Sequence, residues 1–132
     1  MATTTEPTLH AKTISPTLTV NDVQQSLAFF ENLGFAVEDR WEEQGKLLGV
    51  MLRAGDASVG LTQDDWKKGR DRQKGVGMRL AIDTRQNIDQ IASRAKTAGV
   101  KLDSEPHDTE WKTRAFDVTE PSGFKITMSS DK

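Results

Sequence analysis

The sequence contains one weak pattern twice, in which an alternating strand is followed by a helix that ends at a glycine and then by further strands. The first copy covers residues 17–62 and the second covers residues 79–129. In both copies, apolar residues at helical spacing lead to a glycine, Gly34 in the first and Gly99 in the second. This repeat constrains the fold more than any single motif, because two half-sheets with matching faces can enclose one pocket.

Turn and cap residues divide each copy into one strand, one helix and three more strands. In the first copy we expect a strand from Thr17, a helix that Asn21 or Asp22 caps and that runs to about Asn32, and strands at 36–42, 46–54 and 57–63. In the second copy we expect a strand at 76–83, a helix that Asn87 caps and that runs to about Thr97, and strands at 101–106, 111–118 and 123–130. The sequence therefore predicts an α+β fold of two tandem βαβββ modules, which form a curled, eight-stranded mixed sheet around a cavity.

A length of 132 residues is typical of one domain with a shared core. Residues 1–12 are rich in threonine and show no period, so we expect a flexible tail there. Residues 13–131 form the predicted domain, with module one at 13–63, a connector at 64–75 and module two at 76–131. The connector is highly charged and carries glycines, so it is expected to be a linker outside the core.

Composition excludes several classes of function. The net charge of -2 comes from interspersed acids and bases, so no basic stripe favours nucleic acid. The chain has no cysteine, which excludes disulfides and thiolate metal sites. No apolar run approaches the roughly 18 residues of a membrane span, and the first residues lack the pattern of a signal peptide. We therefore expect a cytoplasmic protein with neither a membrane nor a nucleic-acid partner.

Period-two alternation sorts the predicted strands into two faces. One face is apolar and should pack under the helices; it comprises Leu18, Val20, Val59, Leu61, Leu80, Ile82, Ile126 and Met128. The other face is mainly polar, and either faces water or, in a curled sheet, lines a pocket. Arg79 lies on this polar face, where its guanidinium either binds a planar anion in a pocket or pairs with a surface acid.

Four short motifs together resemble one family. They are Leu18-Thr19-Val20-Asn21-Asp22, Leu33-Gly34-Phe35, Trp111-Lys112-Thr113-Arg114-Ala115-Phe116 and Glu120-Pro121-Ser122-Gly123-Phe124. With the repeated βαβββ order, they resemble the vicinal oxygen chelate superfamily over about residues 14–130. That superfamily includes glyoxalase I, bleomycin-resistance proteins, fosfomycin-resistance enzymes and extradiol dioxygenases. The resemblance implies a cup-shaped site and a homodimer.

The resemblance also identifies the positions at which metal-using members carry their ligands. Here these positions are Ser15, Gly60, Gly77 and Thr127, which offer neither imidazole nor carboxylate. His107, with Asp108 and Glu110 close in sequence, is more typical of solvated turn chemistry than of a metal site. We therefore expect no metal and no cofactor.

Resemblance to the metal-free members implies binding or sequestering of a small organic molecule, planar or anionic, without a catalytic residue. The predicted ligand-binding residues are Ser15, Thr17, Gly60, Thr62, Gly77, Arg79, Trp111, Lys125 and Thr127. Trp111 lies at the mouth of the cup by its place in the motif and can stack a planar ligand. For Trp41 and Trp66, ordinary packing is the preferred interpretation.

Two alternatives remain open from the sequence. One is a lyase or isomerase of glyoxalase type, or a dioxygenase, with an unusual site; Lys125 could act as its base only if it were desolvated. The other is a regulatory or interaction module without a ligand, which a filled cup would favour.

Overall fold

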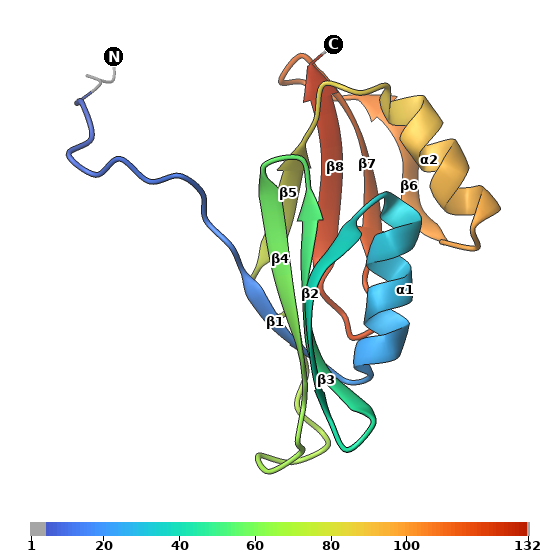
Figure 1. Cartoon of the computed structure of the whole chain (residues 1–132). Coiled ribbons are helices and arrows are strands. Elements are labelled where there is room, and N and C mark those ends of the chain that lie inside the picture. The colour runs from blue at the N-terminus through green and yellow to red at the C-terminus, as the bar shows by residue number, and fades with distance from the viewer. Residues whose placement is uncertain (1–4, 132) are drawn as a thin grey trace.

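The computed structural model describes residues 5–131 and contains two modules with the same order of elements (Figure 1). Module one consists of β1 (Thr17–Val20), α1 (Val23–Leu33), β2 (Ala36–Glu43), β3 (Lys46–Ala54) and β4 (Ala57–Gln63). Module two consists of β5 (Arg79–Asp83), α2 (Ile88–Thr97), β6 (Leu102–Asp108), β7 (Thr113–Thr119) and β8 (Lys125–Asp131). The predicted βαβββ repeat and the α+β class are confirmed.

The strands form two four-stranded mixed sheets. The first sheet has the order β1-β4-β3-β2 and the second has the matching order β5-β8-β7-β6. In each sheet the first strand pairs in parallel with the last, with Thr17 opposite Gly60 and Arg79 opposite Lys125. The other pairings are antiparallel, as hairpin connections require.

The helices begin and end where their cap residues predict. Asp22 caps α1 by accepting the backbone N–H groups of Gln24 and Gln25 at 3.0 and 3.2 Å, and Gly34 ends it with a φ of 113°. In module two, Asn87 caps α2 by accepting the N–H of Gln90 at 3.0 Å.

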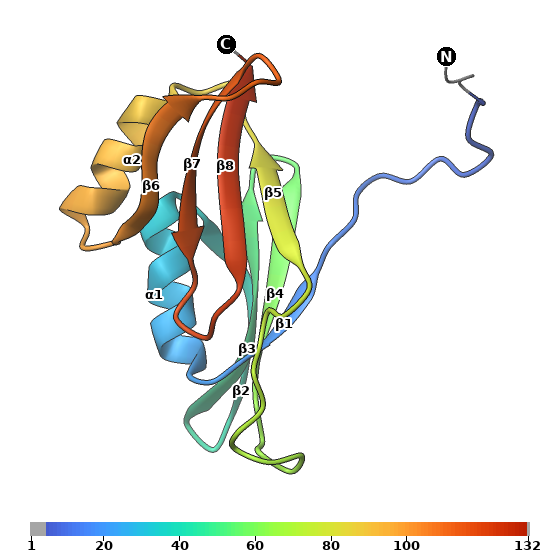
Figure 2. The same cartoon turned by 180° about the vertical axis from the view of Figure 1, so that it is seen from behind.

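One hydrophobic core joins the two modules, because α1 and α2 contact each other and each packs on its own sheet. Phe30 and Phe116 are fully buried, one from each module. Of the eight predicted core residues, six are buried; Leu80 and Ile82 are partly buried and pack against the same cluster. In the view from behind, β5, β7 and β8 lie in front with no helix over them (Figure 2).

The predicted tail and the first residues of the predicted strand at 76–83 both lie outside the helices and strands. Residues 5–16 form no helix or strand. Thr13, Ser15 and Pro16 still hydrogen-bond to module one, whereas the residues before them run away from the two modules (Figure 1). Residues 1–4 of the predicted tail lie outside the described residues. The predicted strand at 76–83 begins only at Arg79, because Gly75 and Gly77 adopt positive φ values of 77° and 75°.

Within the described chain, no helix is long and apolar enough to cross a membrane.

Candidate functional site

The predicted ligand-binding residues from module one lie on the face of the first sheet opposite α1, here called the first open face. Thr17 and Gly60 are direct neighbours across the β1–β4 pair. A methyl group on Gly60 would lie 3.2 Å from Thr17 Oγ1 and 3.5 Å from Met51 Cε. The space where a metal-ligating side chain would project is therefore occupied by the chain's own Thr17 and Met51.

Hydroxyl groups line the β1 side of the first open face. Ser15 Oγ and Ser58 Oγ form a short hydrogen bond just before β1 begins. At the other end of the same strand pair, Thr19 Oγ1 and Thr62 Oγ1 lie 3.4 Å apart. Thr62 is exposed, and its hydroxyl can therefore also bond to a ligand.

Trp41, from β2, also belongs to the first open face. It pairs with Gly49 of β3, and a methyl group on that glycine would lie 3.3 Å from Trp41 Cε3. The Trp41 ring therefore extends over the glycine, and the residue remains 50% exposed. Packing was the interpretation preferred from the sequence, but half of this side chain contacts solvent.

The corresponding face of the second sheet, here called the second open face, carries a charged network. Arg79 Nη1 donates to Thr127 Oγ1 at 3.1 Å and lies 3.4 Å from Asp117 Oδ1. Thr127 donates to the same carboxylate oxygen at 2.5 Å, and Ser104 donates to the other at 3.0 Å. Arg79 is thus paired with an acid, although its side chain is 48% exposed. Neither Asp117 nor Ser104 was among the residues predicted from the sequence.

Lys125 lies beside Arg79, in register on β8. Its Nζ donates to Thr119 Oγ1 at 3.3 Å, and Thr119 donates to Asp103 at 2.5 Å. Gly77, two residues before β5, has no atom within 4 Å of the position where a methyl group would project. Arg79 and Lys125 therefore make this end of the second open face charged, with open space at Gly77.

Trp111 lies apart from the other predicted residues. It is on the β6–β7 turn and is 74% exposed. The register places this turn beside Asp131 at one end of β8, whereas Arg79 pairs with Lys125 at the other end. Six residues of a strand span about 20 Å, so Trp111 and Arg79 do not meet within one chain.

The residues present do not fit the metal site that the resemblance locates. The hydroxyls of Ser15 and Thr127 are poor ligands, and Gly60 and Gly77 provide no side chain. Among residues 5–131, no group of three or more histidine, aspartate or glutamate side chains is placed to hold a metal ion. His107 Nδ1 instead lies 2.8 Å from the backbone oxygen of Glu105.

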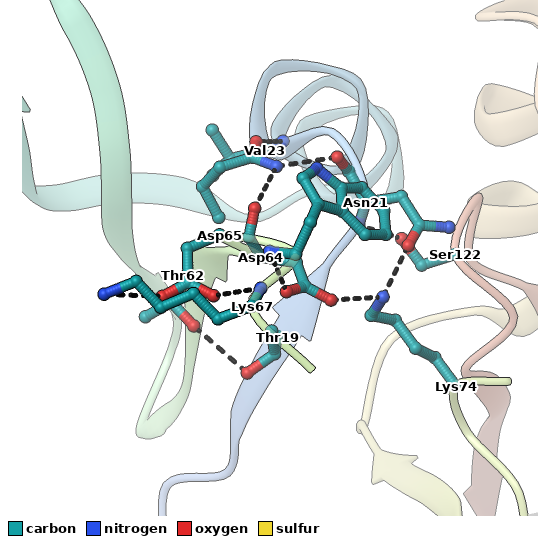
Figure 3. A network of polar contacts seen from close by, with 11 residues as sticks. Thr19, Asn21, Val23, Thr62, Asp64, Asp65, Lys67, Lys74 and Ser122 are labelled. Carbon is teal, nitrogen blue, oxygen red and sulfur yellow. Dashed lines mark hydrogen bonds and ion pairs between the residues drawn. The ribbon is translucent and has the colours of Figure 1, made fainter. Parts of the chain in front are cut away.

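The connector is anchored at both ends by polar contacts (Figure 3). Lys74 Nζ lies 2.8 Å from Asp64 Oδ2, and the two side chains are 4% and 3% exposed. The same ammonium donates to Asn21 Oδ1 at 2.6 Å and lies 4.6 Å from the centre of the Trp66 ring. The hydrogen bond from Lys74, together with one from the Trp66 N–H, lowers the pKa of Asp64. The charged side chains of Lys74 and Asp64 can be buried here because they form an ion pair with each other.

The same junction ties module one to the β7–β8 turn. Asn21 N donates to Ser122 Oγ at 2.8 Å, which places Ser122 beside Asn21 in Figure 3. Ser26, on α1, forms a short hydrogen bond with the buried carboxylate of Glu120. The Glu120-Pro121-Ser122-Gly123 motif thus contributes to the contact between modules.

Two shallow hollows lie away from the open faces. One, of about 250 Å³, is lined by α1 residues and by Gly99, Val100, Lys101 and Thr119. The other, of about 310 Å³, surrounds the start of α2 and includes Arg114 and Asp89. Arg114 donates to Asp89 at 2.7 and 2.9 Å and to Asp108 at 3.0 Å, which lowers the pKa of Asp89. These contacts occupy Arg114 and Asp89, two of the charged residues that line that hollow.

Solved structures of similar fold come from several bacteria. TioX from Micromonospora sp. ML1 has a TM-score of 0.72 at 15% identity, covering 92% of this chain and 100% of that one. The virulence protein STM3117 from Salmonella typhimurium has a TM-score of 0.68 at 19% identity, covering 94% and 99%. A glyoxalase/bleomycin resistance protein/dioxygenase from Nocardioides has a TM-score of 0.66 at 17% identity, covering 97% and 85%. At these identities the likeness concerns the fold alone.

No curated protein matches the chain. The family model described as Glyoxalase/Bleomycin resistance protein/Dioxygenase superfamily matches residues 10–128, which include both modules and the connector. With the repeated βαβββ order and the matching sheet order, this match shows that the chain belongs to the glyoxalase/bleomycin resistance protein/dioxygenase superfamily.

Proposed function

We propose that this protein binds or sequesters a small organic molecule on its open faces and does so without a metal ion. The observation that carries the proposal is the chemistry of the four ligand positions. Ser15, Gly60, Gly77 and Thr127 lack metal-binding side chains, and Thr17 with Met51 fills the space above Gly60. The surrounding hydroxyl and aromatic groups suit an organic ligand better than a cation.

The proposed ligand-binding residues are divided between the two open faces. Ser15, Thr17 and Thr62 offer hydroxyl groups from the first, while Lys125 and Thr127 offer polar groups from the second. Arg79 is the candidate for an anionic group of the ligand, because its contact with Asp117 is long, at 3.4 Å, and half of its side chain faces solvent. An anionic ligand would compete with that carboxylate. Trp111 can reach this set only from another copy of the chain.

A homodimer is part of the same proposal. The superfamily commonly pairs such chains, and exposed apolar residues border β5 here, with Val76 72% and Met78 42% exposed. A second chain would cover them and bring further side chains to the open faces. Light scattering during gel filtration tests this part, with a mass near twice 14.6 kDa expected. A cytoplasmic location also remains a proposal.

The enzyme alternative has less support from the geometry. Lys125 is exposed, so it does not meet the desolvation that a lysine base requires. An interaction module without a ligand has less support, because Thr62, Arg79 and Lys125 on the open faces are exposed to solvent rather than covered by the chain.

The experiment combines elemental analysis with ligand screening. Protein is purified without added metal, incubated with nickel, zinc, manganese and ferrous iron, desalted and analysed; we expect no metal near one per chain. A panel of small planar and anionic compounds is then screened by tryptophan fluorescence, with binding expected for at least one compound and weakened by Arg79→Ala when the compound is anionic. Stoichiometric metal would overturn the metal-free proposal, and absence of binding across the panel would favour the interaction module.

A further inference from the structure

A flat aromatic surface is built into the first open face. Gly49 has no side chain, and the Trp41 ring extends over it, with Cε3 3.3 Å from the position of a missing methyl group. Thr62 Cγ2 lies 3.8 Å from the same position, so the Thr62 methyl group lies beside the Trp41 ring. A larger residue at 49 would press both on the Leu61 backbone oxygen, 3.1 Å from the same position, and on the tryptophan ring. The glycine therefore sets the height of the ring above the sheet.

The neighbouring side chains extend this surface. Met51, two residues from Gly49 on the same face of β3, places its Cε over Gly60. A thioether beside an indole is adaptable and polarisable, and both groups bind aromatic rings well. Because Trp41 is half exposed and Met51 is only partly buried, the surface faces solvent.

A carboxylate lies at the border of the aromatic surface. Asp39 is two residues before Trp41 on β2, the pairing between them is regular, and both therefore point to the same face. Its Oδ1 accepts the N–H of Arg40 at 2.9 Å, and within residues 5–131 the carboxylate has no ion pair. The nearby Glu38, in contrast, is held by Arg53 at 2.8 Å. Asp39 is therefore available to a hydrogen-bond donor or a positive charge on a ligand.

We propose that Trp41, Met51 and Asp39 form a subsite for a planar heteroaromatic ring that carries an N–H or ammonium group. The ring stacks on Trp41 and Met51, and Asp39 accepts from the donor group. This inference rests on the proposed function and names the chemistry of the ligand at the first open face. A cation on an indole face gains further from the ring quadrupole.

The other two tryptophans do not offer such a surface. Lys74 Nζ and the Arg70 guanidinium lie 4.6 and 5.0 Å from the centre of the Trp66 ring, so cations of the chain already cover it. Trp111 lies on a turn and is 74% exposed. Trp41 alone of the three combines a glycine beneath the ring with a free carboxylate beside it.

The test compares two planar three-ring probes of opposite charge, proflavine and anthracene-2-carboxylate, by isothermal titration calorimetry on the full chain. We expect proflavine to bind and Trp41→Ala to weaken its affinity by about tenfold, the scale of one lost stacking contact. Asp39→Asn should weaken proflavine by about threefold and leave any binding of the anthracene carboxylate unchanged. Leu9→Ala, which removes another exposed apolar side chain, is the control and should change nothing.

Gly49→Ala provides a second variant that keeps the tryptophan. The added methyl would press on the ring and on the Leu61 backbone oxygen, so proflavine affinity should fall, and circular dichroism checks that the fold stays intact. Loss of affinity in Trp111→Ala, with Trp41→Ala unchanged, would overturn the assignment of the stacking residue. Equal binding of both probes in wild type and in Asp39→Asn would overturn the role of the carboxylate. If proflavine fails but another compound of the panel binds, this inference is wrong and the proposed function stands; if nothing binds, both fail.

Discussion

The two open faces come from two modules with matching strand orders, yet their chemistry differs. The first is built over two glycines, Gly49 and Gly60, and presents Trp41 and Met51. The second presents a charged network centred on Asp117. Beneath both faces, the core positions remain apolar and buried. The comparison shows that burial constrains one side of each sheet, whereas the other side can diverge without loss of the fold.

The difference matters for recognition. Aromatic and thioether groups bind by contact area, so in the proposed function the first face would select ligand shape. The guanidinium of the second face would select charge, and its pairing with Asp117 would have to be broken before a ligand could use it. A ligand that spans both faces would thus be recognised by its shape at one end and by its charge at the other.

The largest expected effect tests whether the two modules contribute equally to the shared core. Phe30→Ala and Phe116→Ala each remove a fully buried ring from one module. We expect each variant to lose about 3–5 kcal/mol of stability, because the change combines lost burial with a cavity. Urea unfolding followed by circular dichroism measures both. A loss below about 1 kcal/mol for either would show that one module contributes little to the shared core.

The next prediction compares two glycines that have nearly the same positive φ but different surroundings. Gly75 has a φ of 77°, and a methyl group there would lie 2.5 Å from the backbone oxygen of Gly123. Gly77 has a φ of 75° and open space around it. We expect Gly77→Ala to cost about 1 kcal/mol through backbone strain alone, and Gly75→Ala to cost clearly more, since backbone must also move. Equal melting temperatures for the two variants would contradict the close contact between the connector and the β7–β8 turn.

The buried ion pair of the connector predicts a dependence on pH. Because Lys74 lowers the pKa of Asp64 from its ordinary value of 3.8, the ionised carboxylate stabilises the folded state. This contribution is complete above about pH 5 and is lost as the pH falls through 3.8 toward the lower folded value. Asp64→Asn should lower the melting temperature by several degrees at pH 7, and the difference from wild type should shrink toward pH 3. Glu38→Gln, which breaks an exposed ion pair, is the matched control and should have a smaller effect. A difference that stays constant with pH would exclude the charge of Asp64 as its cause.

How far the fold could be predicted from the sequence depends on the kind of signal. Both helices end where their caps predict, because Asp22, Asn87 and Gly34 act through local hydrogen bonds and backbone preferences. The core followed from period-two alternation, as at Leu18 and Val20. Such signals lie within a few residues of the element they determine, so one sequence is enough to recognise them.

Contacts between distant residues were harder to predict. The tight turn at Gln44 and Gly45 suggests that Trp41 lies opposite Leu48, but a register shift between Trp41 and Glu42 places it opposite Gly49. The connector looked too polar for burial, since the partner of Asp64 is ten residues away at Lys74 and the pairing depends on chain geometry. Asp117 could have been found from the alternation of β7, because it lies directly opposite Thr127.

The smallest expected effect concerns Arg79 and sharpens the contrast between the two faces. Asp117→Asn removes the negative charge near the guanidinium but keeps a side chain that can hydrogen-bond with Ser104 and Thr127. The stability change should stay below about 1 kcal/mol, because the ion pair is half exposed. Binding of anthracene-2-carboxylate should strengthen by about threefold, since the ligand no longer competes with an internal carboxylate. Proflavine on the first face should be unaffected, and both titrations can be made on the same preparation. If the variant instead strengthened proflavine and left the anion unchanged, the two faces would not divide the recognition of shape and charge, and Arg79 would be only a partner of Asp117 within the sheet.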